Sequence, residues 1–132
     1  MDSLILTGWG QDNPAFRQMF TSRFIPEATL EQMRWFNELQ RISASPEMAY
    51  RLRKVLGGIN VSDQLARVSA PTLVLHCRED AVVPFDLGRE IAAGIPGARF
   101  VPLEGRNHLI LESEPAFPRF LGEVRSFLAN HR

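Results

Sequence analysis

The sequence predicts an α/β protein in which a helical N-terminal segment precedes a parallel βαβ unit and a C-terminal amphipathic helix. Two strand-like segments carry the prediction, a continuous apolar run over 71–77 and a second run over 98–103. A strand that is apolar on both faces is typical of a parallel sheet covered on both sides. The roughly 20 residues between the two segments suit a right-handed crossover and are too many for a hairpin.

Three short helices are predicted before residue 60. The segment 13–22 begins with Asn-Pro, a helix cap followed by a proline at the first helical position. The segment 29–43 begins with a Thr-x-x-Gln capping box. Its predicted apolar face consists of Leu30, Met33, Phe36 or Trp35, Leu39 and Ile42. The segment 45–56 begins with Ser-Pro and ends at a Gly-Gly pair, which terminates helices well. Its apolar stripe at helical spacing consists of Met48, Ala49, Leu52, Val55 and Leu56.

The second half contains two further predicted helices. Residues 85–94 form the crossover between the strands. The closing helix has the strongest helical periodicity of the sequence, with apolar residues at i, i+3, i+4, i+7, i+10 and i+11. These residues are Phe117, Phe120, Leu121, Val124, Phe127 and Leu128.

Two regions are predicted, a helical cap-like segment over 1–65 and a βαβα portion over 66–132, together forming one folding unit. Two parallel strands with one or two helices leave both sheet edges open and bury little surface. We therefore expect a homo-oligomer, or a missing N-terminal half, to complete the sheet.

Charge and composition exclude several classes of partner. Fifteen Lys and Arg balance fifteen Asp and Glu, so no general attraction to nucleic acid or anionic membranes is expected. No apolar run approaches the ~20 residues of a membrane span, and the first residues lack a basic signal-peptide start. A single cysteine, Cys77, excludes an internal disulfide and a Cys-rich zinc site. We expect a cytoplasmic protein with no metal and no cofactor.

Two side chains suited to acid–base chemistry follow the predicted strands. Asp80 lies three residues after the first strand, and His108 lies just past the second. The carboxyl ends of parallel strands share one edge of the sheet, where open α/β sheets place their sites. A carboxylate there can orient an imidazole, as in two thirds of a hydrolytic triad. From the residues alone, Asp80 could instead be a solvated loop carboxylate or a helix cap, and His108 could be a loop histidine.

Five motifs in order resemble the C-terminal half of an α/β-hydrolase. They are the strand 71–76, the loop Asp80-x-x-x-Pro84, Pro96-Gly97-Ala98, Gly105-x-x-His108, and Glu112-x-Glu114-Pro115-x-x-Pro118 before the closing helix. The order of that family is nucleophile, acid, histidine. The resemblance implies that Asp80 is the acid, that His108 is the general base, and that residues 13–65 form the helical cap. The stretch 8–14 is similar to hydrolases found alone or attached to LuxR-type regulators and nucleotide cyclases.

The sequence departs from the family in one large respect, since it contains no Gly-x-Ser-x-Gly. The nucleophile and half of the oxyanion hole are therefore missing. Because the parts of a triad act as a unit, we predict that the chain alone is catalytically incompetent. Cys77 is predicted to be a buried apolar residue, Ser113 a cap of the final helix, and His76 a packing residue within its strand.

Two functions stay open from the sequence. The first is a serine hydrolase of small ester-like substrates, to which this chain contributes cap, acid and histidine. The second is a truncated, non-catalytic hydrolase domain that serves as a ligand-binding or oligomerisation module of a regulatory protein. Four aromatic residues fit a substrate pocket or a core equally well: Trp9, Trp35, Phe36 and Phe85.

Overall fold

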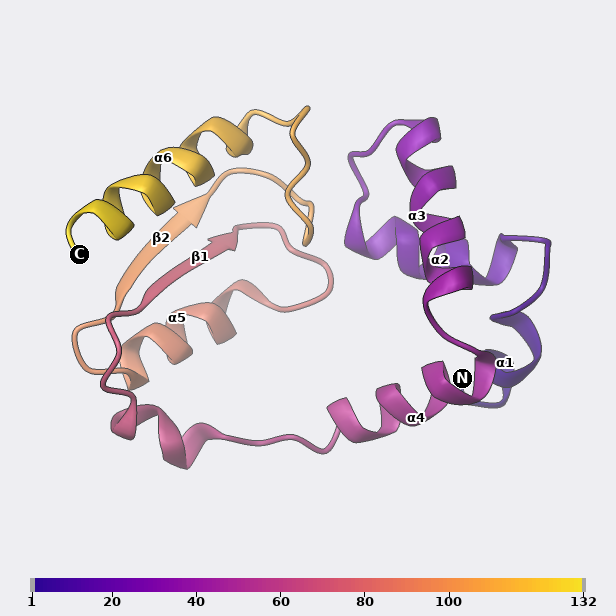
Figure 1. Ribbon diagram of the computed structural model, residues 1–132, viewed down its shortest axis with the longest axis horizontal. Coiled ribbons are helices and arrows are strands. Elements are labelled where there is room, and N and C mark those ends of the chain that lie inside the picture. The colour runs from indigo at the N-terminus through magenta and orange to yellow at the C-terminus, as the bar shows by residue number, and fades with distance from the viewer. Residues whose placement is uncertain (1, 132) are drawn as a thin grey trace. The chain divides into compact units, whose positions relative to one another are not determined.

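The computed structural model describes residues 2–131, and the side chains from Leu4 to His131. The chain divides into two compact units (Figure 1). The first unit ends at Asn60 and the second begins at Val61.

The first unit is helical. Its helices are α1 (Asp2–Gly8), α2 (Ala15–Phe24), α3 (Leu30–Ser43) and α4 (Pro46–Leu56). α1 packs against α2 and α4, and α2 packs against α3. The sequence does not predict α1, because seven residues are too few to display a helical period. The packing of the buried Ile5 stabilises this short helix, whose own sequence favours a helix only weakly.

The predicted starts of α3 and α4 are confirmed. Thr29 Oγ1 accepts a hydrogen bond from Gln32 N at 3.2 Å, and Gln32 Oε1 accepts one from Thr29 N at 2.8 Å. Ser45 caps α4 through Met48 N at 3.2 Å, with a proline at the first helical position. Each cap satisfies backbone donors that a helix start would otherwise leave exposed.

The start of α2 differs from the prediction by one position. Pro14 occupies the N-cap rather than the first helical position, and the Asn13 side chain accepts from Ala15 N at 2.9 Å. The helix also continues beyond Ser22 to Phe24.

The interior of the first unit is organised around a buried arginine. Arg17 is 1% exposed and donates to the carbonyl oxygens of Trp9, Gln11 and Asn37 at 2.5, 2.6 and 3.0 Å. Thr21, which is also buried, links the side chains of Asn37 and Gln40 at 2.6 and 2.8 Å. The buried polar groups of this network therefore satisfy one another.

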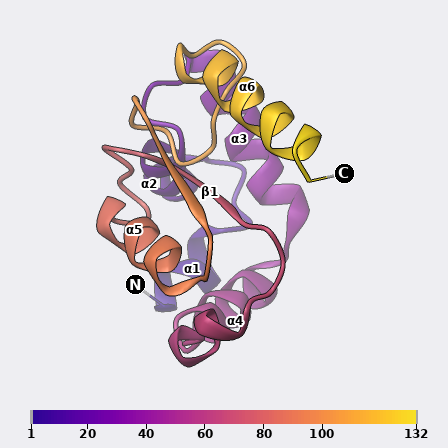
Figure 2. The ribbon, with the colours of Figure 1, turned by 90° about the vertical axis from the view of Figure 1, so that its left-hand side faces the viewer.

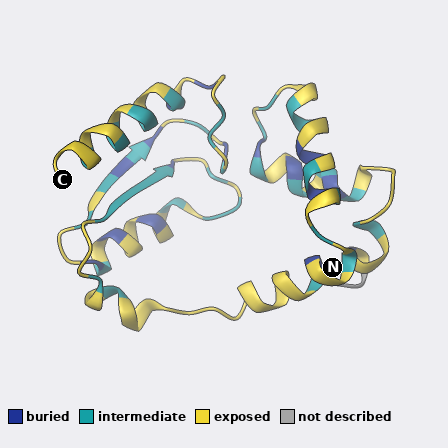
Figure 3. Cartoon of the chain, viewed as in Figure 1, coloured by how far each residue is buried: buried dark blue, intermediate teal, exposed yellow. Residues whose placement is uncertain are grey.

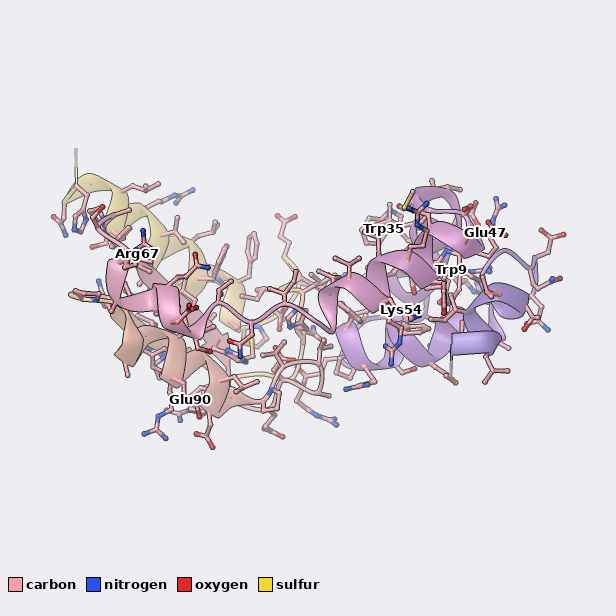
Figure 4. The ribbon with its side chains drawn as sticks, turned by 90° about the horizontal axis from the view of Figure 1, so that it is seen from below. Trp9, Trp35, Glu47, Lys54, Arg67 and Glu90 are labelled. Carbon is pink, nitrogen blue, oxygen red and sulfur yellow. The ribbon has the colours of Figure 1, made fainter. Side chains whose placement is uncertain are left out.

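The apolar stripe predicted on α4 is mostly exposed. Of its members only Ala49 is buried, and Figure 3 shows most of this helix in the colour of exposed residues. The exposed members are Met48, Leu52, Val55 and Leu56. Figure 4 shows Lys54 on the same helix. Its Nζ lies over the Tyr50 ring, 5.6 Å from the ring centroid.

The second unit is the predicted βαβ arrangement with a closing helix. It consists of the 3₁₀ helix η1 (Ser62–Arg67), β1 (Leu73–Cys77), α5 (Phe85–Gly94), β2 (Arg99–Leu103) and α6 (Ala116–Ala129). β1 and β2 pair in parallel, from Leu73 opposite Arg99 to Cys77 opposite Leu103. α5 and α6 cover opposite faces of this sheet (Figures 1 and 2).

Each face of the sheet has its own packing. On the α6 side, Cys77, Val101, Leu103 and Ala116 form a buried cluster. The cluster is extended by Leu73, Leu75, Ile110 and Phe120. On the α5 side, Phe85 lies edge-on to Phe100 with 5.4 Å between ring centroids. Figure 4 shows Glu90 on the outer side of α5. The predicted burial of Cys77 is confirmed, and it follows from the alternation of side chains along β1.

Across the part of the chain that the structure describes, no helix is long and apolar enough to cross a membrane.

Candidate active site

The two residues predicted at the carboxyl edge of the sheet are in direct contact. His108 Nδ1 lies 2.7 Å from Asp80 Oδ2. The Asp80 side chain is 4% exposed, whereas that of His108 is 30% exposed. Since a carboxylate only accepts, Nδ1 carries the proton and donates it to Oδ2. Asp80 thereby selects the tautomer and the orientation of the ring.

Backbone hydrogen bonds between the two loops bring these residues together. Arg78 N donates to Leu103 O at 3.0 Å, which continues the strand pairing past the end of β1. Glu79 N then donates to Gly105 O at 3.2 Å. Gly105 has φ +138°, a conformation that side-chain-bearing residues rarely adopt. The loops that carry the acid and the histidine therefore leave the sheet already joined.

The other oxygen of Asp80 is held by its own loop. Oδ1 accepts hydrogen bonds from Val82 N at 2.7 Å and from Val83 N at 3.0 Å. Burial of this carboxylate raises its pKa, but the hydrogen bonds from His108, Val83 and Val82 lower it by more. The pKa of Asp80 is therefore below its ordinary value, and the group is an anion at neutral pH.

A second imidazole reaches the same carboxylate. His76 Nε2 lies 3.5 Å from Asp80 Oδ2 and 2.9 Å from Val83 O. The prediction that His76 is only a packing residue misses this contact. The available signal was the i, i+4 spacing from Asp80 at the end of a strand, but a strand sequence does not show which way the following loop turns.

A buried glutamate, Glu114, binds the backbone of the turn that follows His108. Its Oε1 accepts a hydrogen bond from Leu111 N. The prediction that Ser113 is the cap of the closing helix is wrong, since Pro115 occupies the N-cap position. The proline leaves no amide N–H of its own to satisfy, and Glu114 binds the preceding turn instead.

The arrangement can orient and polarise an imidazole. Nδ1 is used by Asp80, so Nε2 is the ring nitrogen suited to exchange a proton with a nucleophile. Cys77 is 3% exposed within the α6-side cluster, which is unsuitable for a nucleophile. Among residues 2–131 the structure contains no group of three or more His, Cys, Asp or Glu that could hold a metal ion.

Comparisons with known proteins point to one fold. No protein-family model matches the chain. YisY, an AB hydrolase superfamily protein of Bacillus subtilis (strain 168), is 33% identical over 92 residues, covering 70% of the chain and 32% of YisY. The esterase EaEST from Exiguobacterium antarcticum has a TM-score of 0.79 at 22% identity, over 97% of the chain and 47% of the esterase. A hydrolase from Pseudomonas aeruginosa PA01 has a TM-score of 0.74 at 26% identity, over 96% and 48%.

The chain has a partial α/β-hydrolase fold. The resemblance seen in the five sequence motifs is confirmed at this level, because the homologues and structural neighbours are α/β-hydrolases. The chain spans about half the length of the two solved structures and about a third of YisY. Within the α/β-hydrolase fold, Asp80 and His108 follow two adjacent parallel strands at one sheet edge.

Proposed function

We propose that this chain supplies the acid and the histidine of a serine hydrolase that cleaves small ester-like substrates. The observation that carries the proposal is the 2.7 Å contact between Asp80 Oδ2 and His108 Nδ1. It is supported by two structural neighbours, of which one is an esterase and the other a hydrolase. The nucleophilic serine comes from polypeptide outside these 132 residues, because the sequence holds no Gly-x-Ser-x-Gly.

Each proposed residue has a defined role. His108 Nε2 takes the proton of the serine hydroxyl as the oxygen attacks the ester carbonyl, and returns it to the leaving alcohol. A water molecule then repeats the attack on the acyl-enzyme, again with His108 as the base. Asp80 remains ionised and stabilises the imidazolium that forms in both steps, which its lowered pKa favours.

The same proposal assigns a partner to the sheet. In the described residues the sheet has two strands, β1 and β2, so each strand has an edge without a strand partner. Exposed parallel edges are unfavourable. We place the serine-bearing half of the fold on this sheet, with residues 13–65 as the cap over its substrate. Pairing with a second copy of the chain instead would give a homo-oligomer without a serine nucleophile.

Two narrower assignments belong to this proposal. The stretch 8–14 supports membership of the group of hydrolases that occurs alone or attached to LuxR-type regulators and nucleotide cyclases. Sequencing of the gene and its flanking DNA tests this, because it shows whether the reading frame also encodes a regulator or cyclase domain. The single cysteine supports a reducing, cytoplasmic compartment, which cell fractionation tests.

The test is fluorophosphonate labelling of native source-cell extract, followed by mass spectrometry of every labelled species. We expect peptides that contain Phe100–Arg106 in a labelled chain, or in a chain that co-purifies stably with one. An unlabelled species of 14.9 kDa as the sole form of these peptides would contradict the proposal. It would favour a binding or assembly role for the chain.

A further inference from the structure

His76 lies in β1, and its side chain contacts the loop that carries Asp80. It is the fourth residue of β1, and its side chain is 10% exposed. Its Nε2 atom faces two oxygen atoms, Val83 O at 2.9 Å and Asp80 Oδ2 at 3.5 Å. One ring nitrogen thus contacts both ends of the Asp80–Val83 turn.

The partners of Nε2 determine where the proton of His76 lies. A backbone carbonyl and a carboxylate can only accept hydrogen bonds. A neutral His76 must therefore carry its proton on Nε2 and donate it to Val83 O, with Asp80 Oδ2 as a longer second acceptor. This is the opposite tautomer to that of His108, whose Nδ1 donates to the same Asp80 oxygen.

The ring of His76 packs closely against α5. A Cβ added at Gly88, in α5, would lie 2.3 Å from His76 Nδ1. Only the absence of a side chain at Gly88 allows the ring to lie against that helix. On another side, Phe85 is edge-on to the ring, with 5.8 Å between centroids. The position of Nε2 is therefore set by β1 and α5, and not by the loop that it contacts.

We infer that His76 is a positioning residue for Asp80, because it ties the Asp80–Val83 turn to the rigid sheet through Nε2–H. The turn closes through Asp80 Oδ1 and the amides of Val82 and Val83, and His76 fixes the carbonyl at its far end. Asp80 Oδ2 is then held where His108 Nδ1 meets it. The consequence for catalysis rests on the proposed function, whereas the geometry itself belongs to this chain.

Two substitutions at His76 separate this role from simple packing. His76→Leu keeps an apolar side chain of similar size but removes the donor, whereas His76→Gln keeps an N–H donor near the position of Nε2. In His76→Leu we expect the amides of Val82 and Val83 to exchange with solvent about tenfold faster. The Asp80 carboxyl, followed by ¹³C NMR, should titrate at higher pH as its hydrogen bonds weaken. His76→Gln should restore both measurements toward wild type, and His131→Leu should change neither.

A folded His76→Leu protein with wild-type exchange at Val82 and Val83 would overturn the inference. If His76→Leu fails to fold, the tautomer of His76 in the unaltered chain decides, measured by long-range ¹H–¹⁵N correlation. The inference expects the proton on Nε2 of the neutral ring, and a proton on Nδ1 alone would refute it. None of these measurements needs hydrolase activity. Failure of the serine-hydrolase proposal would therefore leave them unaffected, and their failure would leave that proposal standing.

Discussion

Replacing Asp80 by alanine and by asparagine should destabilise the second unit to different extents. In the native structure Oδ1 accepts from Val82 N and Val83 N, and Oδ2 accepts from His108 Nδ1, all within 3.0 Å. Asparagine keeps one oxygen for the two backbone amides and loses only the charge and the acceptor toward His108. Alanine removes these three hydrogen bonds, together with the longer contact to His76, from a site that is 4% exposed. At about 1 kcal/mol for each hydrogen bond, we expect Asp80→Ala to cost about 3 kcal/mol and Asp80→Asn about 1 kcal/mol.

Urea unfolding measures this difference, with NMR amide signals of β1 and β2 as the probe. Both tryptophans, Trp9 and Trp35, lie in the first unit, so fluorescence does not report directly on the sheet. With an m-value of about 2 kcal/mol/M, the two variants should differ by about 1 M in their midpoints. Equal midpoints for Asp80→Ala and Asp80→Asn would refute the reasoning that Oδ1 holds the turn.

Three further predictions follow from the same geometry. Because the pKa of Asp80 is lowered in the folded state, its contribution to the free energy of unfolding is present above about pH 4. It should be lost as the pH falls through the folded pKa, so acid unfolding curves of wild type and Asp80→Asn should converge at low pH; parallel curves would contradict this. Gly88→Ala should cost about 1–3 kcal/mol, since its Cβ would lie 2.3 Å from the His76 ring. A Cβ added at Gly122 has no atom within 4 Å, so Gly122→Ala should stabilise the protein by up to about 1 kcal/mol. Equal melting temperatures for the Gly88 and Gly122 variants would contradict the close packing of His76 against Gly88. Arg17→Met should cost about 3 kcal/mol, because the carbonyl oxygens of Trp9, Gln11 and Asn37 lose the hydrogen bonds that the buried guanidinium donates. Tryptophan fluorescence follows the unfolding, and an unchanged midpoint would exclude that role.

Local sequence signals predicted the helices that begin with a side-chain cap. The capping box at Thr29 and the Ser-Pro start at Ser45 are both confirmed, because each cap satisfies its own helix without distant partners. The parallel pairing of β1 and β2 is also confirmed. It could be predicted because the segment between the strands is too long for a hairpin. The short helix α1 could not be predicted, because its stability comes from packing rather than from its own sequence.

Burial within the first unit was less predictable than its helices. The predicted apolar face of α3 includes Leu30 and Ile42, yet both are exposed, while the polar Asn37 and Gln40 are buried. These two polar residues are buried because Thr21 and the other members of the arginine-centred network satisfy them. Such a network depends on partners from several helices, so the periodicity of one helix cannot reveal it.

The candidate site shows the same division. The order of strands and loops was enough to predict that Asp80 and His108 share one sheet edge, and they lie in contact. The contact of His76 with Asp80 was missed, because the i, i+4 spacing alone does not show that the turn after β1 brings Asp80 back over its own strand. Sequence position placed both loops at the correct edge, but the path of each loop depends on backbone hydrogen bonds such as Glu79 N to Gly105 O.

The central claim is that His108 is the base for a serine supplied from outside this chain. The most direct test is the rate of fluorophosphonate labelling of the species that holds these peptides, compared between wild type, His108→Ala and His131→Ala. We predict that His108→Ala abolishes labelling, because the serine loses its base, while His131→Ala labels at the wild-type rate. Labelling of His108→Ala at the wild-type rate, or no labelling of the wild-type species, would contradict it.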